Sequence, residues 1–208
     1  MRQLTLLFIA LLLAWSEPAP AQGAPLCYRA QPRPACSAFV FTNFGAYLVL
    51  GRDALDDTPF REVADWGLMA NVTSRDAVGA SVFASLDRLG FGLGPAVRYR
   101  RWLSSAAALD IAVGTPLVTT TDDIQSGSVF GLVRWSPNDW LAVAARPELV
   151  RRSVFLGCGP TTCASGVESR GRVSLGLEFG RTPGLALTAA ASVATFLLVA
   201  AAIAAGGS

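Results

Sequence analysis

Three carboxylates and a set of arginines are the residues whose types and spacing could support chemistry in this chain. Asp110, Glu148 and Glu178 each occupy a polar position in an alternating apolar–polar pattern. Paired carboxylates can act as general acid and base, as in glycoside hydrolysis. The sequence has no histidine, which excludes Ser-His-Asp triads, Cys-His pairs and histidine-ligated metals. We expect the acids instead to form ion pairs with arginines on the same face.

These ion pairs would form a charge network inside the folded chain. All 17 basic residues are arginine, and the formal net charge is only +2, so no basic patch indicates nucleic-acid binding. No cofactor or metal is expected. The predicted network residues are Asp65, Arg98, Arg100, Asp110, Arg134, Arg146, Glu148, Arg172 and Glu178.

The four cysteines form two close pairs in the sequence. An even number at short spacing in an exported chain indicates disulfides. We expect Cys27–Cys36 before the first strand and Cys158–Cys163 inside a loop. A metal site is the alternative, but the chain has no histidine and neither pair has C-x-x-C spacing.

The first residues have the pattern of a secretory signal peptide. Arg2 precedes the apolar run Leu4–Trp15, and an A-x-A ending follows. We expect residues 1–21 to be the signal, with cleavage after Ala21, and residues 22–37 to form a disulfide-tied segment. A membrane-spanning helix is the alternative, but it needs about 20 apolar residues and the run is shorter.

Period-two alternation between Ser37 and Gly180 predicts the strands that position the charge network. No helical periodicity interrupts it. The predicted fold is all-β, an eight-stranded antiparallel up-and-down membrane β-barrel over residues 38–181, with a hydrophobic C-terminal helix. The expected strands are Ala38–Leu50, Glu62–Thr73, Val78–Leu86, Phe91–Trp102, Ala107–Val118, Ser128–Ser136, Trp140–Arg151 and Gly171–Gly180.

The connections between these strands differ in length at the two ends of the predicted barrel. Outer-membrane barrels have short turns on the periplasmic side and longer loops outside. The connections of the predicted outer end are all long except Asp87–Gly90, and those of the other end are short. The outer connections are Gly51–Arg61, Asp87–Gly90, Thr119–Gly127 and Arg152–Arg170.

The direction of the apolar face distinguishes two types of barrel. In a membrane barrel the apolar side chains face lipid and the polar ones line the interior, whereas a soluble calyx inverts this. The polar set here is rich in glycine, alanine, serine and arginine, which suits a narrow interior. We therefore expect the apolar set to face lipid. The aromatic residues expected at the membrane interfaces are Trp66, Tyr99, Trp102, Trp135 and Trp140.

An uncharged segment, Leu185–Ala205, follows the last strand. As a helix its 21 residues would be about 30 Å long, the thickness of a bilayer core. We expect Thr182-Pro183-Gly184 to break the strand and residues 182–208 to form a helix that spans the bilayer or lies against the barrel wall. Small residues that would permit close packing include Ala190, Ser192 and Ala194.

On this pattern of strands, residues 38–180 resemble the small eight-stranded outer-membrane barrels of Gram-negative bacteria. The resemblance implies an outer-membrane location and contact with membrane lipid, lipopolysaccharide included. Such barrels often end on an aromatic residue of the last strand, whereas here a hydrophobic tail follows Phe179. The barrel enzymes of this group that act on lipid depend on histidine, so their chemistry is not transferable to this chain.

The expected function is a non-enzymatic structural or surface-interaction role, with the loop at Cys158–Cys163 as the contact point. One alternative is a periplasmic lipid-binding calyx anchored to the membrane by the C-terminal helix. A second is a narrow channel that prefers anions because arginines line it. The remaining alternative is an enzyme that works through Asp110 or Glu178.

Overall fold

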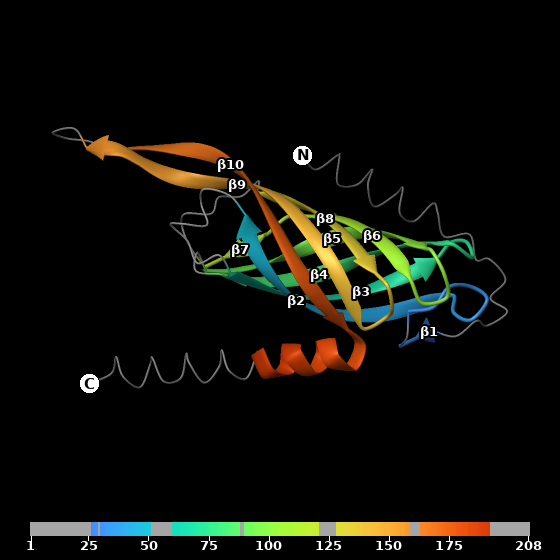
Figure 1. Ribbon diagram of the computed structural model, residues 1–208. Helices are drawn as coiled ribbons and strands as arrows, with labels where there is room; N and C mark the ends of the chain where they lie inside the picture. Colours follow the sequence, from blue (N-terminus) through green and yellow to red (C-terminus); the bar gives the residue numbers. More distant parts are fainter. Residues whose placement is uncertain are drawn as a thin grey trace.

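The chain closes into a barrel of antiparallel strands in the computed structural model (Figure 1). The structure describes residues 26–28, 30–50, 60–87, 90–120, 128–158 and 163–191, with only the backbone of Asp87, 152–158 and 163–165. The barrel strands are β2 (Ala38–Leu50), β3 (Phe60–Asn71), β4 (Asp76–Asp87), β5 (Gly90–Trp102), β6 (Ala108–Gly114), β8 (Val129–Ser136), β9 (Leu141–Cys158) and β10 (Cys163–Gly180). Two further short strands are β1 (Leu26–Cys27) and β7 (Val118–Thr119).

Closure depends on β2, which pairs with both β3 and β10. Thr42 lies opposite Trp66 of β3, and Gly45 lies opposite Glu178 of β10. Every other barrel strand pairs in antiparallel fashion with its neighbours in chain order. The predicted eight-stranded up-and-down barrel is therefore confirmed.

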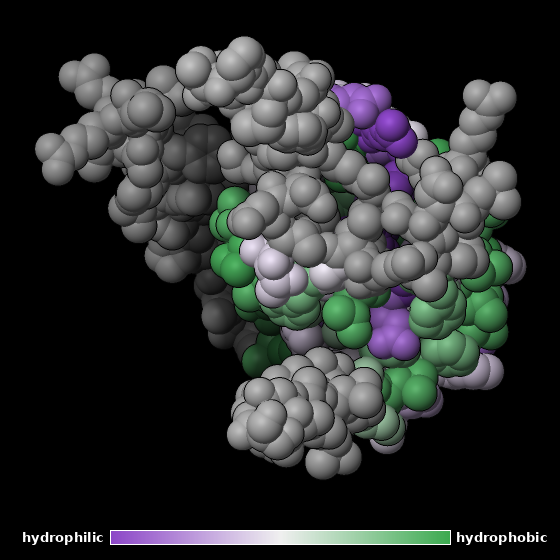
Figure 2. Space-filling model, turned by 90° about the vertical axis from the view of Figure 1, so that its left-hand side faces the viewer, coloured by the Kyte–Doolittle hydropathy of each residue, from purple (hydrophilic) through white to green (hydrophobic). Residues whose placement is uncertain are grey.

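The alternation predicted from the sequence places apolar side chains outside and polar ones inside. In β5, Val97 is 65% exposed, whereas the next residue, Arg98, is 5% exposed. Seen from the end of the barrel at the left of Figure 1, hydrophobic residues form the sides and hydrophilic residues show between them (Figure 2). The outer face of the wall is therefore apolar, whereas the interior contains both charged and apolar side chains.

The strand predicted as Ala107–Val118 is interrupted. β6 ends at Gly114, and the chain rejoins the sheet only at β7, which pairs with Gly92 and Leu93. Pro116 lies in the interruption and has no N–H to donate to the ladder. The displaced backbone packs against Gly94, where a Cβ would meet the Thr115 carbonyl oxygen and lie 2.9 Å from the Pro116 Cα.

The connection predicted as the loop Arg152–Arg170 is formed mostly of strand. β9 and β10 each extend over 18 residues and reach Cys158 and Cys163, which are register partners. The pairing of β9 with β8 stops at Leu149, and the pairing of β10 with β2 stops at Val173. Beyond these residues β9 and β10 pair with each other and with no other described strand. Figure 1 shows the resulting ribbon projecting from one end of the barrel, at the left of the view.

A short helix, residues 181–191, begins directly after β10. The expected break at Thr182-Pro183-Gly184 is instead the first turn of this helix, a position that proline tolerates. Gly184 and Thr188 are buried, whereas Ala190, one of the three small residues predicted to pack, is exposed. Ser192, Ala194 and the rest of the expected span lie outside the described residues. No helix within the described ranges is long and apolar enough to cross a membrane.

The core of the molecule is the barrel interior, which holds two apolar clusters. One is centred on Tyr47, Phe83, Phe130 and Leu132. The other contains Phe39, Phe41, Met69 and Trp102 and lies toward the end with the short turns, where Cys27 and Ala30 pack against it. We call that end the turn end and the opposite one the loop end.

Candidate functional site

The structure places all nine residues of the predicted charge network inside the barrel. Asp110 is 1% exposed and Arg134 is 2% exposed, and the side chain of Arg172, at 8%, is the least enclosed of the arginines in the network. The residues come from strands β3, β5, β6, β8, β9 and β10. The barrel wall therefore brings together groups that lie far apart in the sequence.

Asp110 and Glu178 form the centre of one group of ion pairs. Arg100 approaches Asp110 with Nε at 2.5 Å and Nη2 at 2.8 Å. Arg134 joins the two acids, with Nη1 3.0 Å from Asp110 and Nε 3.0 Å from Glu178. The hydroxyl of Tyr47 also donates to Glu178.

Glu148 is the centre of a second group at the loop end. The Nε atoms of Arg146 and Arg172 each lie 2.7 Å from its oxygens, and Arg61 also donates to it. Arg61 was not predicted, because the strand was expected to begin at Glu62. The sequence could have predicted Arg61, because it lies four residues before Asp65 and every second residue of a strand shares a face.

The remaining predicted acid, Asp65, pairs with Arg98. The Nε of Arg98 also donates to the hydroxyl of Ser81 at 3.1 Å. Each of the four interior carboxylates of the described residues therefore contacts at least one arginine. This is the arrangement of a structural salt-bridge network, in which the positive charge of each arginine offsets the negative charge of a buried carboxylate.

Aromatic rings fill the space between the ion pairs. The guanidinium of Arg146 lies 3.6 Å from the ring centroid of Phe130, which packs edge-to-face on Phe83. Arg100 lies over the ring of Trp102 at 5.0 Å. Cation–π contacts of this kind stabilise a buried cation without a second acid.

Trp102 was expected at a membrane interface, and this expectation was wrong. Its side chain points into the barrel, is 5% exposed and donates from Nε1 to the Asn71 side chain at 2.9 Å. The other four aromatic residues of that set, Trp66, Tyr99, Trp135 and Trp140, are at least 36% exposed.

The N-terminal segment covers the turn end of the interior. The predicted Cys27–Cys36 disulfide is present, and β1 pairs in parallel with the start of β2. Asn71 fixes this segment by donating to the carbonyls of Gln31 at 2.7 Å and Cys36 at 2.9 Å. The predicted Cys158–Cys163 disulfide falls on side chains outside the described residues.

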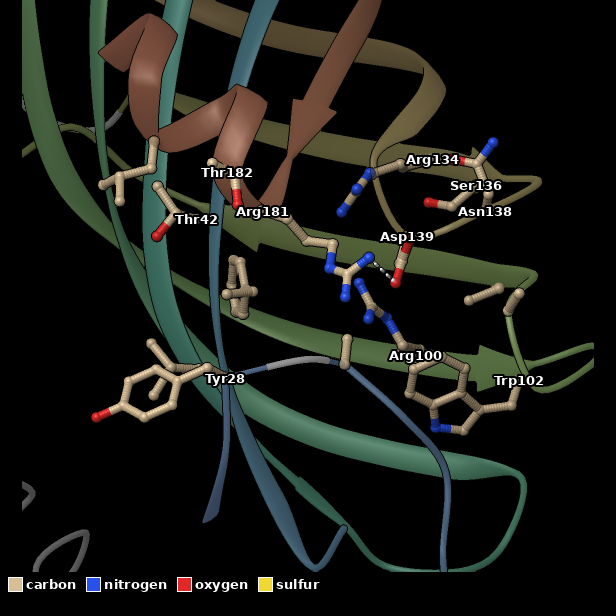
Figure 3. Close-up of a pocket in the computed structure, with 16 residues that line it drawn as sticks. Tyr28, Thr42, Arg100, Trp102, Arg134, Ser136, Asn138, Asp139, Arg181 and Thr182 are labelled. Atoms are coloured by element: carbon tan, nitrogen blue, oxygen red, sulfur yellow. Dashed lines mark ion pairs between the residues drawn. The ribbon is translucent and has the colours of Figure 1, made fainter. Parts of the chain in front are cut away.

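A cavity of about 370 Å³ lies at the turn end, between the N-terminal segment, the strand turns and the start of the helix. Figure 3 shows Arg100, Arg134 and Arg181 directed toward the same space. Arg181 pairs with Asp139 at 2.6 Å. A smaller space of about 40 Å³ at the loop end, beside Arg146 and Glu148, shares no lining residue with it.

The larger cavity is lined by arginines and by one carboxylate, that of Asp139. Within the described ranges no group of three or more acidic, cysteine or histidine side chains could hold a metal. The carboxylates are ion-paired, and the groups that line the larger cavity include three arginines. No protein-family model matches the chain, and no curated protein matches its sequence.

Proposed function

We propose that this chain is a membrane-spanning barrel of the outer-membrane type, without a catalytic step, that presents an interaction surface at the membrane. The observation that carries the proposal is the polarity of the barrel, which is apolar outside and charged inside. Contact with membrane lipid, lipopolysaccharide included, is part of the same proposal.

The outer wall supports this proposal because its apolar side chains would be costly to leave in water. Ile111, Val143 and Leu175 are 44%, 48% and 46% exposed, and they represent a face that continues from strand to strand. Contiguous apolar patches on soluble monomers are rarely larger than a few hundred Å². β2 and β5 have 13 residues each, more than the ~9–11 that a tilted membrane strand needs.

The interior favours a closed barrel over a channel. Tyr47 with Glu178, and Arg98 with Asp65, lie in the interior and line neither of the two cavities. An eight-stranded barrel is just wide enough for its side chains to fill the interior. We therefore do not propose conduction, although arginines are abundant there.

The β9–β10 ribbon is the element best suited to interaction. From Val150 to Cys158, β9 pairs with β10 and with no other described strand, and this stretch is about 30 Å long at ~3.3 Å per residue. A two-stranded ribbon whose outer edges pair with no described strand can add a strand from a partner. The predicted contact point at Cys158–Cys163 is the tip of this ribbon.

Heat-modifiability on a gel, combined with membrane fractionation, tests the proposal. The chain is compared with and without residues 182–208, a deletion that leaves every strand pairing of the barrel complete. We expect a faster-migrating unheated band from the outer-membrane fraction for both proteins. A truncated protein that is soluble without detergent and shows no mobility shift would overturn the proposal.

A further inference from the structure

The turn-end cavity reaches both faces of the barrel wall. On β2, Phe41 points inward while Val40 and Thr42 point outward, yet all three line the cavity. The pairing explains this, because β10 pairs with β2 only from Asn43 onward and β1 only with Ala38 and Phe39. Among the described strands none pairs with that edge of residues 40–42, about 10 Å of wall at ~3.3 Å per residue. The start of the helix approaches it at the Thr42 carbonyl, which leaves the edge of Val40 and Phe41 without a strand or helix partner in the described part of the chain.

On its inner side the cavity is lined by two arginines, while the carboxylates that pair with them lie deeper in the barrel and do not line it. Asp110 and Glu178 do not line the cavity, whereas Arg100 and Arg134 do. Arg100 contacts Asp110 through Nε and Nη2, and Arg134 contacts the two acids through Nε and Nη1. One terminal nitrogen of each guanidinium thus has no described partner and can donate to a ligand.

A buried hydroxyl in the same wall also lacks a partner. Ser136 lines the cavity and is 4% exposed, and its Oγ makes no hydrogen bond within the described part of the chain. Buried polar groups of native proteins are nearly always hydrogen-bonded, and exceptions indicate a ligand, an ion or water. An oxygen-rich group beside Arg134 would satisfy this hydroxyl.

The outer side of the opening is apolar. Leu185, in the helix, is 57% exposed, and Tyr28, beside β1, is 87% exposed, and both line the cavity. The cavity is thus cationic toward the barrel axis and apolar toward the outer wall. Its volume of about 370 Å³ falls within the ~300–1,000 Å³ typical of small-molecule sites.

We propose that this cavity binds a single-chain lipid with an anionic phosphate headgroup. The phosphate accepts from the remaining terminal nitrogens of Arg100 and Arg134 and from Arg181, since charge-assisted hydrogen bonds from arginine to phosphate are strong. The acyl chain leaves over the open edge of β2 and lies on the outer wall beside Val40 and Leu185. Membrane insertion, as proposed above, would supply such a lipid, but the site can be tested in detergent.

Calorimetric titration of the full chain in a neutral detergent tests this proposal. The probes are a single-chain acyl glycerol phosphate, a phosphocholine lipid with the same chain, and inorganic phosphate. We expect saturable binding of one acyl glycerol phosphate per barrel, weakened about tenfold by Arg181→Gln. Arg101→Gln should leave it unchanged, because Arg101 also pairs with an aspartate, Asp76, but lies outside the cavity.

A second pair of variants tests whether the acyl chain of the lipid leaves the cavity over β2. Thr42→Trp should block the opening and abolish binding of the lipid, whereas Val97→Trp, on the exposed outer wall of β5 and outside the cavity lining, should not. Absence of saturable binding would overturn the proposal. If inorganic phosphate binds as tightly as the acyl glycerol phosphate, and Thr42→Trp does not weaken its binding, the ligand is a free anion and the lipid proposal is rejected.

Equal binding of the phosphocholine lipid, unaffected by Arg181→Gln, would also overturn the proposal, since the headgroup would then not be recognised. Heat-modifiability is measured on each sample and membrane fractionation on the same variants. Loss of binding in a folded, membrane-inserted barrel would therefore reject the lipid site alone. A failure to insert would reject the proposed function instead.

Discussion

Asn71 connects three parts of the molecule through one buried amide. Its side chain is 1% exposed and bonds to Gln31, Cys36 and Trp102. Asn71→Ala would leave two carbonyls and an indole N–H without this partner. We expect it to lower the free energy of unfolding by about 3 kcal/mol, since a lost partner typically costs ~1–3 kcal/mol.

Urea titration followed by tryptophan fluorescence measures this effect. Asn43→Ala is the matched control, because Asn43 is 3% exposed and its Nδ2 has no partner among the described residues. We expect the control to cost about 1 kcal/mol or less. Equal losses for the two variants would show that the Asn71 bonds do not hold the N-terminal segment to the barrel.

The sequence predicted the inward position of the charged residues well because the period of a strand is two. Once Arg98 is inside, Arg100 must be inside too, and both are 5% exposed. Trp102 lies two residues after Arg100 and so faces inward by the same rule. It was nevertheless expected outside, because aromatic residues are common at membrane interfaces. The ion-pair partners were not predictable residue by residue, since they depend on the register between strands.

At the scale of elements, the sequence predicted the eight strands but not where β9 ends and β10 begins. Alternation weakens around Gly157 and Gly166, and a ribbon that pairs only with itself has no buried face to impose a pattern. The helix was predicted from its lack of charge. Its contact with the wall through Gly184 and Thr188 depends on which face of the helix turns toward the barrel, and the amino-acid composition of the segment does not specify this.

The contact between the helix and the wall leads to a prediction. A Cβ at Gly184 would meet the carbonyl oxygen of Phe179 and lie 2.9 Å from that of Thr42, and these backbone atoms cannot move aside easily. Gly184→Leu should therefore detach the helix and increase the rate of tryptic cleavage after Arg181 about tenfold, as a loss of ~1.4 kcal/mol would. Ala190→Leu, on the exposed face, is the control. Equal cleavage rates for the two variants would contradict this packing.

At the scale of the whole molecule, the distribution of charge explains why the barrel is closed. Eight strands enclose little space, and the arginines occupy it together with their acids and with aromatic rings. The two cavities lie at opposite ends and share no residue. Opening a path between them requires removing side chains from the middle of the barrel.

We therefore expect the wild-type chain to give no single-channel steps in a planar bilayer, because packed side chains leave no continuous path for ions. A protein that lacks residues 22–37 should also give no single-channel steps, because that segment lies at the turn end and the middle of the barrel stays packed. The triple variant Tyr47→Ala, Arg98→Ala and Glu178→Ala removes interior side chains that line neither cavity and so lie between them. It should conduct if it retains the heat-modifiable band of a folded barrel. Steps from the wild type that Arg98→Ala and Arg134→Ala abolish would instead support an anion channel, and the interior network would then line a pore rather than close it.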